Sequence, residues 1–115
     1  MRFFISASLL AAVGLLASTP ASAAPLTADN GMTLYVFDKD QGGASSCYGP
    51  CAQNWPPYLA AGAASKGEGW ATAKRKDGKA QWTYKDKPLY FFSGDKAKGD
   101  AKGDGMGGVW HAATD

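Results

Sequence analysis

The chain has 115 residues, of which 45% are hydrophobic and 19% are charged, and its formal net charge is +2. This length leaves room for one domain, and the composition excludes a disordered chain or a coiled coil. The charge is too balanced to indicate binding to nucleic acid or to a membrane surface. One His and two Cys exclude multi-His metal centres, Cys₂His₂ zinc fingers and Cys₄ clusters.

The first 23 residues have the pattern of a secretory signal peptide. A basic Arg2 precedes an apolar run from Phe3 to Leu16, and small residues follow up to Ala23. The run is shorter than the roughly 20 residues that a membrane span needs, and Ala21-Ser22-Ala23 fits a signal-peptidase site. We therefore predict cleavage after Ala23, no retained membrane anchor, and a mature chain of residues 24–115 in the periplasm or outside the cell. No Cys lies near this point to carry a lipid.

A tandem repeat organises the mature chain. The pattern Leu-Tyr-x-Phe-x-x-Asp occurs at 34–40 and returns 55 residues later at 89–95, and in each copy a Trp follows the Asp by 15 residues. The motif positions are Tyr35, Phe37, Asp40 and Trp55 in the first copy and Tyr90, Phe92, Asp95 and Trp110 in the second. We interpret these as two copies of one supersecondary unit, about 26–57 and 81–112, each too small to bury its own apolar face.

Local signals predict a mainly β fold. Alternation in Met32–Phe37 places the Tyr and Phe of the motif on one face, with apolar residues on the other face as well. The stretches 70–76 and 79–84 flank Asp77-Gly78, a type I′ hairpin signal, and a turn at 85–88 leads into 89–92. The expected fold is a small antiparallel sheet domain of two tandem β-hairpin repeats, with a helical turn near Cys47 and Cys51 and a long Gly-rich surface loop at 93–108.

These features resemble the bacterial secreted-repeat family of predicted lipoproteins, which has a Tyr-x-aromatic-x-x-Asp motif. The motif stands here as Tyr35-Val36-Phe37-Asp38-Lys39-Asp40 and as Tyr90-Phe91-Phe92-Ser93-Gly94-Asp95. Cys47-x-x-x-Cys51, Trp55-Pro56-Pro57 and the closing Trp110-His111 also fit the family. The resemblance implies export and a repeat architecture, and it transfers no catalytic residue because the family has no established activity.

The two Cys and the single His admit several interpretations. Cys47 and Cys51 are one helical turn apart, and in an oxidising compartment a structural disulfide is the favoured interpretation. A reversible redox pair is a weaker alternative, because its usual spacing is Cys-x-x-Cys. A metal or haem site of Cys47, Cys51 and His111 is another, since thiolates and imidazole suit copper. Without such a ligand, His111 closes the second repeat as a surface or half-buried residue.

Three other patterns have structural interpretations. Asp40 and Asp95 recur in phase, so we expect each to accept backbone N–H bonds in the turn after its strand. A calcium loop at Asp38 and Asp40 is disfavoured, because Gly49 stands where the bidentate Glu would be. The basic run at 74–76 is interpreted as a solvated hairpin tip, and the aromatic residues as a small core or, alternatively, a ligand platform.

The sequence favours a non-enzymatic exported β domain that binds an envelope ligand or protein or has a structural role. Its rival is a periplasmic redox or metal protein that uses Cys47, Cys51 and His111 with copper or haem.

Overall fold

The computed structural model describes residues 24–62 and 65–115. The predicted signal peptide and its cleavage after Ala23 lie outside the described residues.

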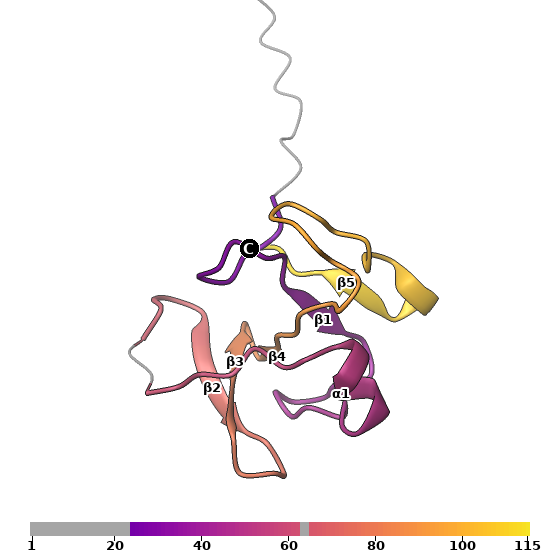
Figure 1. Ribbon diagram of the computed structural model, residues 1–115. Helices are drawn as coiled ribbons and strands as arrows, with labels where there is room; N and C mark the ends of the chain where they lie inside the picture. The colour runs from indigo at the N-terminus through magenta and orange to yellow at the C-terminus, as the bar shows by residue number, and fades with distance from the viewer. Residues whose placement is uncertain (1–23, 63–64) are drawn as a thin grey trace, which may run out of the picture.

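The described chain is mainly β, as the sequence predicts, and forms two small antiparallel sheets (Figure 1). In the first sheet β1 (Tyr35–Phe37) pairs with β5 (Trp110–Ala112). The second is a meander of β2 (Trp70–Lys74), β3 (Ala80–Tyr84) and β4 (Lys87–Pro88). The helical elements are single turns, α1 (Pro50–Asn54) and the 3₁₀ turn η1 (Met106–Gly108).

The two repeats are joined where their motif tyrosines pair. Tyr35 N–H donates to the Tyr90 carbonyl at 2.8 Å, and Tyr90 N–H donates to the Tyr35 carbonyl at 3.0 Å. Tyr35 also pairs with Ala112, at the end of the second repeat, while Tyr90 pairs with Pro57, at the end of the first. Each motif strand is therefore completed by the other repeat, which gives the domain an approximate two-fold arrangement around the tyrosine pair.

Alternation along the motif strand divides the apolar residues into two clusters. Leu34 belongs to a cluster with Leu89, Tyr58 and Trp82, whereas Tyr35 lies with the motif aromatics on the other face. Leu34 and Tyr35 are both fully buried, and so are their counterparts in the second repeat. The strand is covered on both sides, as its two apolar faces predict.

The two hairpin turns differ from the sequence prediction. The type I′ turn expected at Asp77-Gly78 is wrong, because Gly78 has φ of 86° but Asp77 does not have a positive φ. The strand register and the bond from Arg75 N–H to the Lys79 carbonyl (2.8 Å) leave a three-residue loop at 76–78, with Gly78 in the left-handed conformation that typically ends such loops. The two positive φ values of a type I′ turn occur instead at Lys85 (48°) and Asp86 (65°), between β3 and β4.

The predicted surface loop at 93–108 is partly a core element. Most of its residues are exposed, but Asp95 and Gly103 are buried. A Cβ atom placed on Gly103 would lie 2.6 Å from the Trp55 ring. The glycine therefore lets the loop backbone pack directly against that indole.

The turn geometry generates a first prediction. Asp86→Gly removes a non-glycine residue from the left-handed region and should raise the free energy of unfolding by up to about 1 kcal/mol. The same substitution at Asp77 should lower it, because the Asp77 carboxylate accepts bonds from Lys79 N–H (3.0 Å) and Arg75 Nε (3.3 Å). Chemical denaturation of both variants tests this, and equal effects of the two substitutions would contradict the assigned turns.

Candidate functional site

The motif Tyr and Asp residues bond across the repeats. Tyr35 Oη donates to Asp95 Oδ2 at 2.6 Å, and Tyr90 Oη donates to Asp40 Oδ2 at 2.6 Å. Tyr35 and Tyr90 are fully buried, and Asp95 is 8% exposed. Each repeat thus supplies the carboxylate that the other repeat's tyrosine needs.

The second oxygen of each carboxylate holds the following loop. Asp40 Oδ1 accepts Ser46 N–H at 2.8 Å, and Asp95 Oδ1 accepts Lys102 N–H at 2.9 Å. These are backbone bonds of the kind expected from the sequence. The tyrosine partners were not expected, because identical spacing in both copies does not say which copy's Asp a given Tyr meets.

The motif Phe and Trp rings form a four-ring stack inside the domain. Phe37 stacks on Trp110 (centroids 4.1 Å apart), Trp110 on Trp55 (3.8 Å) and Trp55 on Phe92 (4.4 Å). Tyr35 meets Trp55 edge-on at 5.3 Å, and Tyr90 meets Trp110 edge-on at 5.2 Å. Trp55 and Trp110 are 5% and 6% exposed, so these two rings belong to the core and do not present a surface platform.

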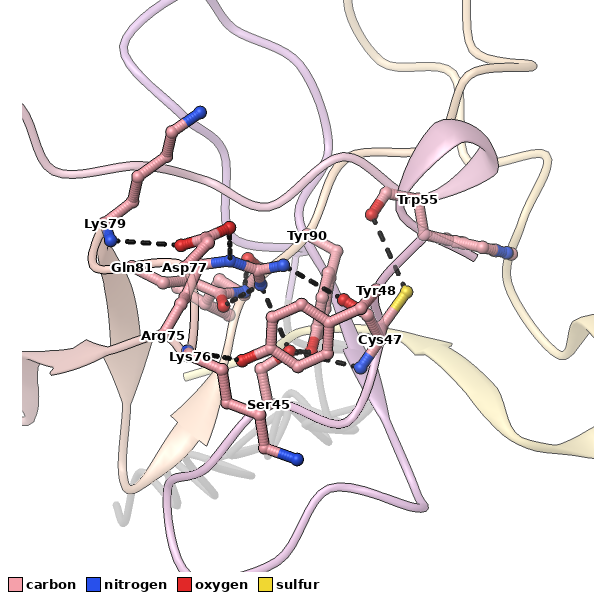
Figure 2. A network of polar contacts seen from close by, with 11 residues as sticks. Ser45, Cys47, Tyr48, Trp55, Arg75, Lys76, Asp77, Lys79, Gln81 and Tyr90 are labelled. Atoms are coloured by element: carbon pink, nitrogen blue, oxygen red, sulfur yellow. Dashed lines mark hydrogen bonds and ion pairs between the residues drawn. The ribbon is translucent and has the colours of Figure 1, made fainter. Parts of the chain in front are cut away.

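A disulfide joins Cys47 to Cys51, with their Cα atoms 5.3 Å apart. Figure 2 shows the buried polar network beside it, centred on Arg75. The Arg75 guanidinium donates to Cys47 O at 3.0 Å, to Ser45 Oγ at 3.1 Å and to Gln81 Oε1 at 2.7 Å. Ser45 Oγ in turn lies 2.6 Å from Tyr90 Oη. The network ties the β2–β3 hairpin to the disulfide loop and to the motif core.

Arg75 corrects the interpretation of the basic run as a solvated tip. Its neighbours Lys74 and Lys76 are exposed, but Arg75 is 5% exposed. The Cζ atom of its planar guanidinium also lies 4.3 Å from the Tyr48 ring centroid. Its charge and stem are held by partners from distant segments, which a run of three basic residues does not reveal.

The structure does not bring together the three residues of the redox or metal alternative. Cys47 packs in the motif aromatic cluster. His111 lies opposite Val36 in the β1–β5 ladder, and Val36 packs against the other cluster. Within 24–62 and 65–115, no group of three or more His, Cys, Asp or Glu side chains could hold a metal ion.

His111 instead borders a cleft between the two sheets. Its Nε2 atom lies 2.8 Å from Asp38 Oδ2, and both side chains are about half exposed. The cleft has a volume of about 310 Å³. It is lined by Val36, Asp38, Tyr84, Lys85, Lys87, Leu89, His111, Ala112, Ala113 and Thr114. The lining combines apolar residues with two lysines and the Asp38–His111 pair.

Comparison with known proteins identifies the repeat. A family model described as a secreted repeat of unknown function matches residues 19–58 and 71–114. The family resemblance drawn from the motif is thereby confirmed. No match was found among curated proteins or among solved structures.

The cross-repeat bonds generate a second prediction. Tyr35→Phe leaves a buried Asp95 oxygen without its donor and should cost about 1–3 kcal/mol of unfolding free energy. Tyr90→Phe should cost less, because Asp40 is only partly buried and water can reach its carboxylate. Tyr84→Phe is the matched control, because no hydrogen bond of the Tyr84 hydroxyl is found in the described part of the chain. Denaturation curves measure the loss of unfolding free energy in each variant. Equal losses in all three would contradict a special role for the two bonds.

The same bonds predict a loss of stability at alkaline pH. Burial, and next the hydrogen bond to Asp95, raise the pKa of Tyr35; burial and the bond to Asp40 raise the pKa of Tyr90. A raised pKa in the folded state stabilises it below the unfolded value of about 10, and this contribution is lost as the pH rises above that value towards the folded pKa. The free energy of unfolding should fall more steeply above about pH 10 in the wild type than in Tyr35→Phe/Tyr90→Phe. Parallel slopes for the two proteins would contradict the prediction.

Proposed function

The chain belongs to the family of secreted repeats of unknown function, and from this premise we propose that it is a non-catalytic ligand-binding domain of the cell envelope. The motif core is its scaffold, and the cleft bordered by Asp38 and His111 is its ligand site. The observation that carries the proposal is that one set of residues forms the core while a different set lines the cleft. The fixed Tyr, Phe, Asp and Trp residues of the motif bond and pack with one another inside the domain, whereas charged residues at other positions line an open cleft.

The cleft chemistry suits a small organic anion with a short apolar part. Lys85 and Lys87 contribute two positive charges, while the one carboxylate of the lining is engaged by His111. Val36 and Ala112, which are both half-buried, provide apolar surface in the same lining. A volume near 310 Å³ stands at the lower end of the range for small-molecule pockets, roughly 300–1,000 Å³. The carboxylate of a short-chain or aromatic acid would pair with the lysines, and its apolar part would pack on the apolar residues of the lining.

The envelope location rests on three observations. The N-terminal pattern predicts export, the family is a secreted one, and the Cys47–Cys51 disulfide suits an oxidising compartment. Among the described residues, no helix is long and apolar enough to cross a membrane. We propose that the mature chain acts in the periplasm or outside the cell.

Titration with benzoate, followed by backbone amide chemical shifts, tests the ligand site. The largest shifts should map to the residues around Lys87 and His111. Lys87→Gln should weaken binding about fivefold, the equivalent of roughly 1 kcal/mol for one charge contact. Lys79→Gln, an exposed lysine at the tip of the other hairpin, should leave affinity unchanged. Shifts elsewhere on the domain, or equal losses in both variants, would overturn the proposal.

A further inference from the structure

A second site lies on the other sheet, where three aromatic rings surround one ammonium group. Lys66 Nζ lies 5.2 Å from the Trp82 ring centroid, 5.5 Å from that of Tyr58 and 5.6 Å from that of Trp70. It also bonds to Asp29 Oδ1 at 2.9 Å. Three rings and one carboxylate around a cation constitute an aromatic cage, which we define by Asp29, Tyr58, Trp70 and Trp82.

Backbone hydrogen bonds and contacts among the rings hold the residues that form the cage. Trp82 N–H donates to the Tyr58 carbonyl at 2.8 Å, and Tyr58 N–H donates to the Leu89 carbonyl at 2.9 Å. Trp70 on β2 meets Trp82 on the neighbouring β3 edge-on, with centroids 6.0 Å apart (Figure 1 shows the two strands). Tyr58 and Trp82 are 8% and 6% exposed. The backbone and most of the ring packing of the cage are therefore set by the sheet and the core, which lowers the ordering cost of binding a cation.

Two further features of the cage point to an external ligand. A hollow of about 410 Å³ adjoins the ammonium, and its lining includes Asp29, Tyr58, Ser65 and Trp82. The Tyr58 hydroxyl is buried and makes no hydrogen bond of full geometry in the described structure, but it lies close enough to the Lys66 ammonium that, after Asp29, it also raises the pKa of that group. Buried polar groups are normally paired, so once the lysine is displaced this hydroxyl needs a polar partner, and the hollow has room for one.

We propose that this aromatic cage binds a small organic cation with a trimethylammonium group, and that Lys66 is a tethered occupant which the ligand displaces. The neighbouring hollow would take the remainder of the ligand, with its polar end near Tyr58 and Ser65.

The cage geometry favours a methylated ammonium over the lysine. With Nζ more than 5 Å from every ring centroid, the rings leave room for methyl groups on N–C bonds of about 1.5 Å. A primary ammonium is strongly hydrated and loses that hydration among the rings, whereas aromatic cages are a recurrent means of binding quaternary ammonium groups. Asp29 supplies the charge preference, and its hydrogen bond raises the pKa of Lys66.

The proposal is tested by measuring the affinity of the wild type and of Lys66→Ala for choline, by calorimetry and by tryptophan fluorescence. Removing the tethered competitor should strengthen choline binding at least about tenfold. Lys66→Gln removes the charge but keeps most of the side-chain length, and it should give the same gain if the alanine variant folds poorly. Lys74→Ala removes an exposed lysine from β2 and should give no gain. A neutral isostere, 3,3-dimethylbutan-1-ol, should bind far more weakly than choline.

Two further experiments test the role of the Asp29 charge and distinguish a lipid headgroup from a free small molecule. Asp29→Asn in the Lys66→Ala background changes a residue at the exposed rim and should weaken choline binding several-fold without a loss of folding. Phosphatidylcholine vesicles should co-sediment with Lys66→Ala if the ligand is a lipid headgroup, and leave it in solution if the ligand is a free small molecule. The proposal is overturned if folded Lys66 variants gain no affinity for choline, or if they bind the neutral isostere with the same affinity as choline. Lys66 would then only hold its loop against the sheet. Either result is independent of benzoate binding in the cleft.

Discussion

Two buried tyrosine hydroxyls that each donate to a carboxylate of the other repeat are the interaction on which the domain depends. A buried carboxylate is costly unless it is hydrogen-bonded, and Asp95 is almost fully buried. Its donor, Tyr35, belongs to the first repeat, and the reverse pair joins Tyr90 to Asp40. Neither repeat can therefore satisfy its own Asp by this bond. The crossed bonds between the Tyr and Asp residues of the motif join the two repeats, and the domain should fold as one cooperative unit.

Around this symmetric centre, the two repeats secure their loops by different means. In the first, the Cys47–Cys51 disulfide and Arg75 hold the segment that leads into α1. In the second, Gly103 allows the backbone to pack against Trp55, and its N–H donates to Tyr35 Oη at 3.2 Å. The helical turns nevertheless occupy matching places, because residues 106–108 stand 55 positions after 51–53. The shared core fixes where each loop must return to its strand, and the chemistry of the loop is free to vary.

The sequence predicts those parts of the fold that depend on local pattern or on repetition. Strict alternation identified both faces of the motif strand, and recurrence 55 residues apart identified the repeat. It does not predict the exchange of partners between repeats, since Tyr35 could reach either Asp by spacing alone. It also misses Arg75, whose burial depends on Ser45 and the Cys47 carbonyl, about thirty residues earlier in the chain. The sequence predicts a turn at 85–88 but not the positive φ values of Lys85 and Asp86, because neither residue is Gly or Asn and the strand register imposes the left-handed conformation.

Departures from the internal symmetry coincide with the two proposed binding sites. In the cleft, Asp38 and His111 stand where the other repeat has Ser93 and Pro56. In the aromatic cage, Tyr58 bonds to Leu89 as Ala113 bonds to Leu34, so the ring of Tyr58 has no aromatic counterpart in the other repeat.

Trp82 likewise occupies the place that Leu26 takes in the first repeat, since each lies between equivalent backbone partners. A core that needs both repeats restrains the motif residues, because a change in one must be tolerated by its partner in the other. Tyr58 and Trp82 lie outside that set of motif residues, although both are buried in the cluster around Leu34 and Leu89. The two repeats therefore fill this second cluster differently, and the difference puts aromatic rings at places where the other repeat has Ala113 and Leu26.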